Sequence, residues 1–126
     1  MQNSFFSESR RRGLLALVVG LTLVGAAVPA ITAAQDQPTV NIIEPSPTDI
    51  MAWGYDNPNL SVTPGQTVIW INIGAQQHTV TADDASLDSG MVDPGNTFSV
   101  EFDNPGIFTY HCTPHPWMTA TITVTS

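Results

Sequence analysis

The chain has 126 residues, which is enough for one domain and too few for two. Apolar residues make up 42% of it and charged residues 11%, so it is too apolar for a disordered chain and too weakly charged for a coiled coil. Its only three basic residues are consecutive, Arg10 to Arg12. Because no phosphate-binding surface can be built from the rest of the chain, nucleic-acid binding is excluded.

The first 34 residues have the pattern of an export signal. The three arginines precede an apolar stretch, Leu14 to Val28, and small residues follow as far as Ala34. This order is typical of a cleaved signal peptide, and the apolar stretch is shorter than the roughly 20 residues that span a bilayer. We expect residues 1–34 to be a signal peptide and 35–126 to be the mature domain, exported to the periplasm or the cell exterior. An uncleaved N-terminal anchor is the alternative.

The part of the chain beyond residue 34 is acidic and has no Lys or Arg. Of the eleven acidic residues only Glu8 precedes it, so the mature domain carries about ten uncompensated negative charges and a long-range negative field. A domain of this size buries only a small, marginal core, which a bound metal would help to stabilise.

The mature chain is expected to fold into short strands. No stretch of ten or more residues repeats apolar positions at the helical period without an interrupting Pro or Gly. The segment 97–102 alternates instead, with Phe98, Val100 and Phe102 on one face. In chain order the expected strands are Thr39–Glu44, Asn59–Thr63, Gln66–Ile73, His78–Ala82, Thr97–Phe102, Ile107–His111 and Ala120–Thr125.

Turn signals separate these strands. Pro64-Gly65, Asp93-Pro94-Gly95 and Asn104-Pro105-Gly106 each join a residue of fixed φ to one that tolerates positive φ. Pro45–Pro58 is the least predictable segment, and Asp83–Met91 is expected to be a surface loop. Short strands with regular turns indicate an all-β sandwich or barrel, in which a site should be sought among the end loops.

The densest group of metal-binding side chains surrounds the only cysteine, Cys112. The run Cys112-Thr113-Pro114-His115-Pro116-Trp117-Met118 offers a thiolate, an imidazole and a thioether. Two prolines flank His115 and stiffen the loop because they fix φ. A lone cysteine in an exported protein has no internal disulfide partner, and the alternatives are a buried structural thiol or an intermolecular bridge. A short, stiff loop between two strands instead aims all three side chains at one point.

His78 lies far upstream and supplies the remaining ligand. An isolated His at the start of a strand is usually an ordinary buried residue. Together with the loop, however, it completes a set of two His, one Cys and a weak axial Met, which is the ligand set of a blue-copper electron-transfer site. The pattern predicts one type 1 copper, cycling between Cu(I) and Cu(II), with a ligand set of His78, Cys112, His115 and Met118.

Other metals and chemistries fit these residues less well. Zinc sites more often use two or more Cys, or three His or carboxylate ligands, and have little use for Met118. Covalent haem attachment needs Cys-x-x-Cys-His, which the chain lacks. A Cys-His nucleophile pair is the enzymatic alternative, but it gives Met118 no role, and no basic side chain is available to bind a substrate carboxylate or phosphate. We therefore expect a protein that is not an enzyme.

Several further candidates are interpreted as non-ligands. His111 precedes Cys112 in an expected strand, so alternation should point its side chain the other way. Met51 and Met91 are expected to fill gaps in the core rather than to bind metal.

The tryptophans and an acidic cluster also have structural interpretations. Trp53 and Trp70 are expected to be core or edge aromatics, whereas Trp117, inside the loop, should form part of an apolar patch around the site. An acidic cluster is expected to lie in a solvated loop, and it consists of Asp83, Asp84 and Asp88. A calcium site is the alternative interpretation of this cluster.

These residues closely resemble the cupredoxin family and, within it, the plastocyanin, pseudoazurin and amicyanin group. The resemblance runs from about Asn59 to Val124 and includes the segments 62–72, 78–80 and 112–118. In plastocyanins and pseudoazurins the axial Met usually stands further from the preceding His than it does here. The loop is therefore most similar to that of amicyanins.

The resemblance implies a Greek-key sandwich of two sheets and about eight strands, with copper at one end and the same four ligands. It also implies that the residue after the first His ties the two ligand loops together. Asn is common at that position, and this chain has Thr79. Its hydroxyl would then bond the backbone near Thr113, and its N–H would reach the Cys112 sulfur.

The sequence therefore predicts a small exported blue-copper protein that carries single electrons between redox partners. We expect it to be a monomer without a transmembrane span in the mature chain, and its charge favours basic partner proteins. A copper storage, delivery or resistance protein is the first alternative. An enzymatic or zinc-binding relative is the second.

Overall fold

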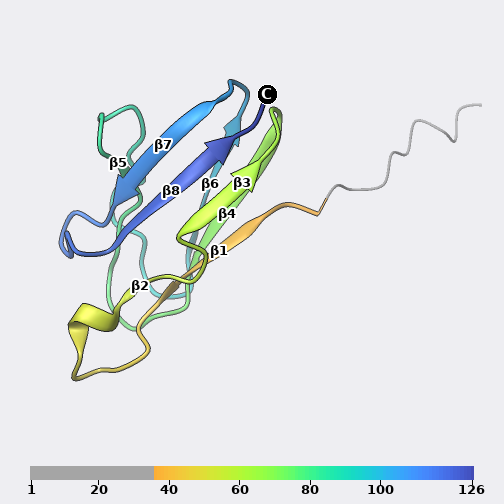
Figure 1. Cartoon of the computed structure of the whole chain (residues 1–126). Coiled ribbons are helices and arrows are strands. Elements are labelled where there is room, and N and C mark those ends of the chain that lie inside the picture. The colour runs from red at the N-terminus through yellow and green to blue at the C-terminus, as the bar shows by residue number, and fades with distance from the viewer. Residues whose placement is uncertain (1–35) are drawn as a thin grey trace, which may run out of the picture. The chain divides into compact units, whose positions relative to one another are not determined.

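The computed structural model describes residues 36–126, so the predicted signal peptide and its cleavage after Ala34 lie outside the described residues. This part of the chain forms eight strands in two sheets of four, which confirms the predicted all-β sandwich (Figure 1). Among the same residues there is no helix with the length and apolar character that a membrane span requires.

Each sheet combines strands from both halves of the domain. The first sheet has the order β2 (Gly54–Tyr55), β1 (Thr39–Ile43), β4 (Gln66–Asn72), β6 (Thr97–Phe102). The second has the order β3 (Asn59–Val62), β8 (Thr119–Val124), β7 (Gly106–His111), β5 (Thr81–Ala82). A short 3-10 helix, η2 (Ile50–Ala52), precedes β2.

Two of the strand pairs are parallel. β1 runs parallel to β4, with Val40 beside Trp70, and β3 runs parallel to β8, with Leu60 beside Ile122. The remaining neighbours are antiparallel. Because β1 and β4 run in the same direction, both finish at one end of their sheet, and the segments that follow them lie together there.

The core lies between the sheets and follows the alternation of the strands. In β4, Val68, Trp70 and Asn72 are buried while the residues between them are partly exposed. Val40 and Ile42 of β1 are fully buried on the same side. Each such aliphatic side chain stabilises the fold by roughly 1.5–3 kcal/mol relative to an exposed one.

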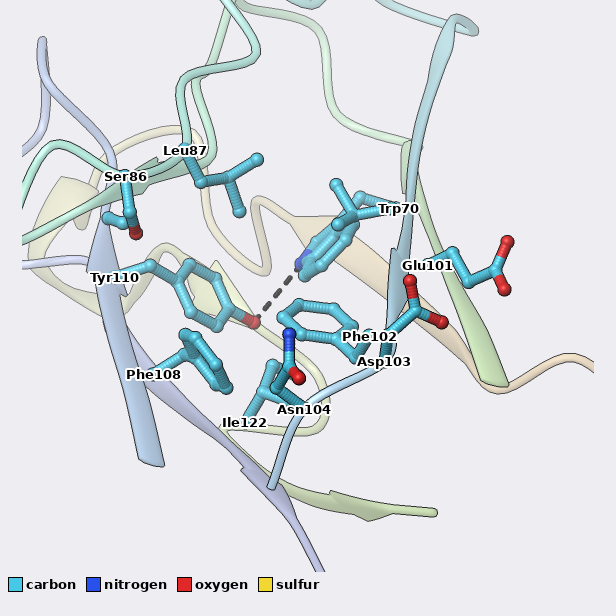
Figure 2. Close-up of a pocket in the computed structure, with 12 residues that line it drawn as sticks. Trp70, Ser86, Leu87, Glu101, Phe102, Asp103, Asn104, Phe108, Tyr110 and Ile122 are labelled. Carbon is cyan, nitrogen blue, oxygen red and sulfur yellow. Dashed lines mark hydrogen bonds between the residues drawn. The ribbon is translucent and has the colours of Figure 1, made fainter. Parts of the chain in front are cut away.

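Aromatic side chains form the centre of this core and border a hollow between β6 and β7 (Figure 2). The hollow has a volume of about 230 Å³. The Trp70 indole N–H donates a hydrogen bond of 3.1 Å to the Tyr110 hydroxyl, which closes one side of it. Burial raises the pKa of Tyr110 to about 12, so this phenol stays neutral. Phe102 and Phe108 pack against each other nearby, with ring centroids 5.3 Å apart.

The expected strands are found close to their predicted bounds, with one exception. Within the predicted strand 78–82 only Thr81 and Ala82 form regular ladder pairs, while His78 makes an isolated bridge to Val92. The reason is that two backbone N–H groups have other acceptors. The Thr79 N–H points to the Cys112 sulfur, and the Val80 N–H donates to the Ser89 hydroxyl.

Two methionines do not occupy the core, so the prediction that they fill gaps was wrong. Met51 lies in η2 and is 65% exposed, because the proline-rich segment around it leaves the sheets and runs over the surface. Met91 is 57% exposed because its neighbour Val92 is the residue that faces inward. All three residues of the acidic cluster are exposed, as predicted for a solvated loop: Asp83, Asp84, Asp88.

Candidate metal centre

Three of the predicted ligands converge at the end of the sandwich. The Nδ1 atoms of His78 and His115 are 3.2 Å apart, and the Cys112 sulfur lies 3.6 Å from the first and 3.5 Å from the second. No other group of three or more His, Cys, Asp or Glu side chains in residues 36–126 has the mutual distances of a metal site. His78 and Cys112 are fully buried, whereas His115 is partly exposed.

A tightly bonded turn between β7 and β8 holds the Cys112 side of the site. The His115 N–H donates to the Cys112 carbonyl at 3.1 Å, and the Met118 N–H donates to the His115 carbonyl at 2.9 Å. The Cys112 N–H then donates to the Met118 carbonyl at 3.0 Å, which closes the turn. Met118 is 1% exposed and belongs to the same buried cluster as Cys112.

Thr79 joins the two segments that carry the histidines. Its hydroxyl accepts a 2.8 Å hydrogen bond from the Thr113 N–H, and its own N–H points to the Cys112 sulfur at 3.3 Å. Its carbonyl accepts a 2.7 Å bond from the Tyr55 hydroxyl. These contacts confirm the role that the family resemblance implied for this position, although the residue is Thr where Asn is common.

Asn72 organises the segment that leads to His78, and the sequence analysis did not single it out. It is fully buried at the end of β4. Its side-chain NH₂ donates to the carbonyls of Gln76 and Val92, and its side-chain oxygen accepts from the Gly74 N–H. His78 itself exchanges two backbone hydrogen bonds with Val92. The approach to the buried histidine is therefore fixed at several points.

Glu44 is a further residue at the site that the sequence analysis missed. Its Oε1 atom lies 2.8 Å from Nε2 of His78, and it also accepts a 2.8 Å bond from the Gln76 N–H. Burial raises the pKa of Glu44, but the hydrogen bonds from His78 and from the backbone of Ala75 and Gln76 outweigh it, so the pKa lies below its ordinary value. The carboxylate is therefore the preferred form.

Two tryptophans cover the histidines from outside the sheets. The ring of Trp53 packs edge-on against His78 and His115, at centroid distances of 5.9 and 5.2 Å. Trp117 packs against His115 at 5.4 Å, and its indole N–H donates to the Ile50 carbonyl at 2.8 Å. Trp53 is thus part of the site surroundings rather than an ordinary core aromatic, while Trp70 lies in the core as predicted.

His115 favours the neutral imidazole and Cys112 the protonated thiol until a cation is present. Burial raises the pKa of the Cys112 thiol, although N–H groups of Thr79 and His115 that point to it act in the opposite direction. Burial, together with the neighbouring His78, lowers the pKa of His115. A metal ion would reverse the first effect because a coordinating thiol is deprotonated.

The donor set fits a copper ion. Nitrogen and sulfur ligands bind a first-row ion such as Zn²⁺ at roughly 2.0–2.3 Å, and ligand atoms around one ion of this kind then lie roughly 3–4 Å apart, as these three do. Two imidazoles and a thiolate with a weak thioether nearby are the donors of type 1 copper. His111 lies outside the group and faces Asp83, with 2.6 Å between Nδ1 and the carboxylate oxygen.

The chain is similar to known copper proteins. Residues 46–125 match the family of copper binding proteins described as the plastocyanin/azurin family. An amicyanin from Paracoccus denitrificans is 37% identical over 81 residues, which cover 60% of this chain and 62% of the amicyanin. A plastocyanin from Prochlorothrix hollandica is 32% identical over 136 residues, covering 95% of this chain and 98% of that protein. A reduced Cu(I) form of an amicyanin variant superimposes with a TM-score of 0.61 and 32% identity, covering 76% of this chain and 89% of that one.

Proposed function

Because the chain belongs to the plastocyanin/azurin family of copper binding proteins, we propose that it carries single electrons through one type 1 copper ion. The ligands we propose are His78, Cys112, His115 and Met118. The observation that carries this proposal is the convergence of both Nδ1 atoms and the Cys112 sulfur, with mutual distances of 3.2, 3.5 and 3.6 Å. Copper, when bound, supplies the one-electron couple between Cu(I) and Cu(II).

The contacts around the site would hold the donor atoms in place in both oxidation states of a bound copper. Thr79 and the closed turn from Cys112 to Met118 fix the loop, and Asn72 fixes the approach to His78. Donors that barely move keep reorganisation small, which makes electron exchange fast. Full burial of His78 and Cys112 also excludes water from the inner side of the site.

The partly exposed His115 provides the route for electrons to leave the protein. It stands between two exposed prolines and beside Trp117, which together form an apolar surface patch. We propose that redox partner proteins dock on this patch, Pro114-His115-Pro116-Trp117. The acidic residues elsewhere would attract basic partners from a distance.

We propose that the protein is an electron carrier and not an enzyme. All four proposed ligands come from the chain, so they leave no open coordination position for a substrate. We further propose that residues 1–34 are a signal peptide and that the mature domain, 35–126, works as a monomer outside the cytoplasm. The proposals of a signal peptide and of a location outside the cytoplasm rest on the sequence pattern of the N-terminal segment.

Voltammetry combined with metal exchange tests electron carriage against copper storage or delivery. The Cu(II)-loaded chain should give a reversible one-electron wave and exchange electrons rapidly with a small redox protein. In the Cu(I) form it should release copper to a competing chelator far more slowly than it exchanges electrons. Rapid copper release with sluggish, irreversible electron transfer would contradict the proposal and favour delivery.

A further inference from the structure

The contact between Glu44 and His78 joins a carboxylate to the buried side of the metal centre. Glu44 directly follows β1, and its side chain is only 9% exposed. Its Oε1 atom lies 2.8 Å from Nε2 of His78. Residues 36–126 contain no Lys or Arg that could pair with this carboxylate, and the imidazole that does contact it belongs to the candidate metal centre.

The two ring nitrogens of His78 therefore face different partners. Nε2 faces Glu44, while Nδ1 faces the Cys112 sulfur and Nδ1 of His115. A carboxylate only accepts hydrogen bonds, so the imidazole must carry its proton on Nε2. In the neutral ring the lone pair is then on Nδ1, directed at the position between the predicted ligands.

Gly74 makes this contact sterically possible. A Cβ atom at position 74 would overlap the Glu44 carboxylate and would lie 2.6 Å from Cδ and 2.9 Å from Cγ of that side chain. The φ angle of Gly74 is not in the positive region, so space and not backbone conformation is the reason for a glycine here. The Asn72 side chain holds Gly74 in place by accepting its N–H at 3.0 Å.

We propose that Glu44 is a positioning residue that fixes the tautomer and orientation of His78 and lowers the reduction potential of bound copper. The proposal rests on the proposed function, that copper binds at this site. A carboxylate on the far nitrogen of a ligand imidazole makes the ligand more basic. Its negative charge stabilises Cu(II) more than Cu(I), and partial burial limits screening by solvent and salt.

The first test compares Glu44→Gln with Glu101→Gln on the copper-loaded full chain. The amide oxygen of the glutamine side chain introduced at position 44 can still accept the Nε2–H, so the visible spectrum should stay unchanged while the charge is lost. The affinity for Cu(II) relative to Cu(I) should fall by roughly tenfold, which is about 59 mV for a one-electron couple. Glu101 is exposed near the end of β6, beside Thr67 at the end of β4 opposite to Asn72 and the site. Its substitution should change the ratio of the Cu(II) and Cu(I) affinities less than about twofold. Equal shifts in both variants would overturn the proposal.

The second test removes the contact without changing Glu44 or a predicted ligand. Gly74→Ala should displace the carboxylate and shift the potential in the same direction as Glu44→Gln. An unchanged potential with an intact fold would overturn the role given to Gly74 and to the contact.

A third measurement reads the contact in the metal-free chain, so it does not depend on copper binding. Nitrogen NMR should show His78 protonated on Nε2, with a slowly exchanging proton that becomes fast-exchanging in Glu44→Ala and in Gly74→Ala. Protonation on Nδ1 in the native chain would overturn the proposal. If the Nε2 proton behaves as expected but Cu(II) gives no thiolate band, the proposed function fails while the contact itself stands.

Discussion

The two histidines of the site are held in opposite ways. His78 is fully buried and is fixed by residues distant in sequence, through Glu44 at Nε2 and Val92 at the backbone. His115 is partly exposed, and its main-chain bonds go to Cys112 and Met118 within its own loop. The difference supports the two proposals, that the buried side sets the electronic properties of the metal and that the loop side contacts the partner.

The largest expected effect comes from replacing Cys112, whose sulfur lies close to both histidines. Cys112→Ser should abolish the intense visible band of the Cu(II) form, because that band requires a Cu–thiolate bond. The metal-free variant should remain a folded sandwich, since Ser and Cys have similar volumes. Absorbance after addition of Cu(II), together with circular dichroism, checks both points. A surviving band would mean that Cys112 is not the ligand.

Removing the Thr79 hydrogen bond that joins the two segments carrying the histidines should lower the stability of the metal-free chain. Thr79→Val leaves the Thr113 N–H without its acceptor in a partly buried contact, which should lower the free energy of unfolding of the metal-free chain by about 1–3 kcal/mol. Thr81→Val is the matched control, because its hydroxyl contacts the same cluster through side chains only. Urea unfolding measures both variants. Equal losses would show that the tie through Thr79 has no special weight.

Much of this arrangement could be predicted because its signals are local. The ligand loop lies within seven consecutive residues, and alternation in β6 identified its buried face with the correct bounds. Gly65 and Gly95 have φ angles of +88° and +82°, as expected for the two turns that contain them.

The parts that were missed depend on contacts across the fold. Glu44 and His78 are 34 residues apart, and only the parallel pairing of β1 and β4 brings them together. The two-residue strand β2 has no periodicity to detect, and its position lies in the proline-rich segment. The position of Trp53 could not be predicted because apolar content alone does not distinguish a core aromatic from one that covers a site.

The proposed axial ligand, Met118, should change the reduction potential of the copper while contributing little to its binding. Met118→Leu should keep the visible band and raise the reduction potential, because losing a weak donor destabilises Cu(II) more than Cu(I). Met91→Leu is a control with the same chemistry at an exposed position, and it should leave the potential unchanged. Protein-film voltammetry compares them. A lower or unaltered potential in Met118→Leu would argue against an axial thioether.

The smallest expected effect concerns how the acidic residues change the rate of electron exchange with charged partner proteins. The acidic surface should attract a cationic redox protein and repel an anionic one, and salt screens both effects beyond about 8 Å at physiological ionic strength. Stopped-flow rates should therefore fall with salt for the cationic partner and rise for the anionic one. Flat dependences for both would leave the acids as solubilising charge and the apolar patch around His115 as the sole basis of docking.

The visible spectrum of the native full chain with one equivalent of Cu(II) tests the central claim most directly. Convergence of Cys112, His78 and His115 at one point predicts an intense thiolate-to-copper band that disappears on reduction and returns on reoxidation. A colourless complex, or one with only weak copper absorption, would contradict a type 1 site and with it the assignment of this protein as an electron carrier.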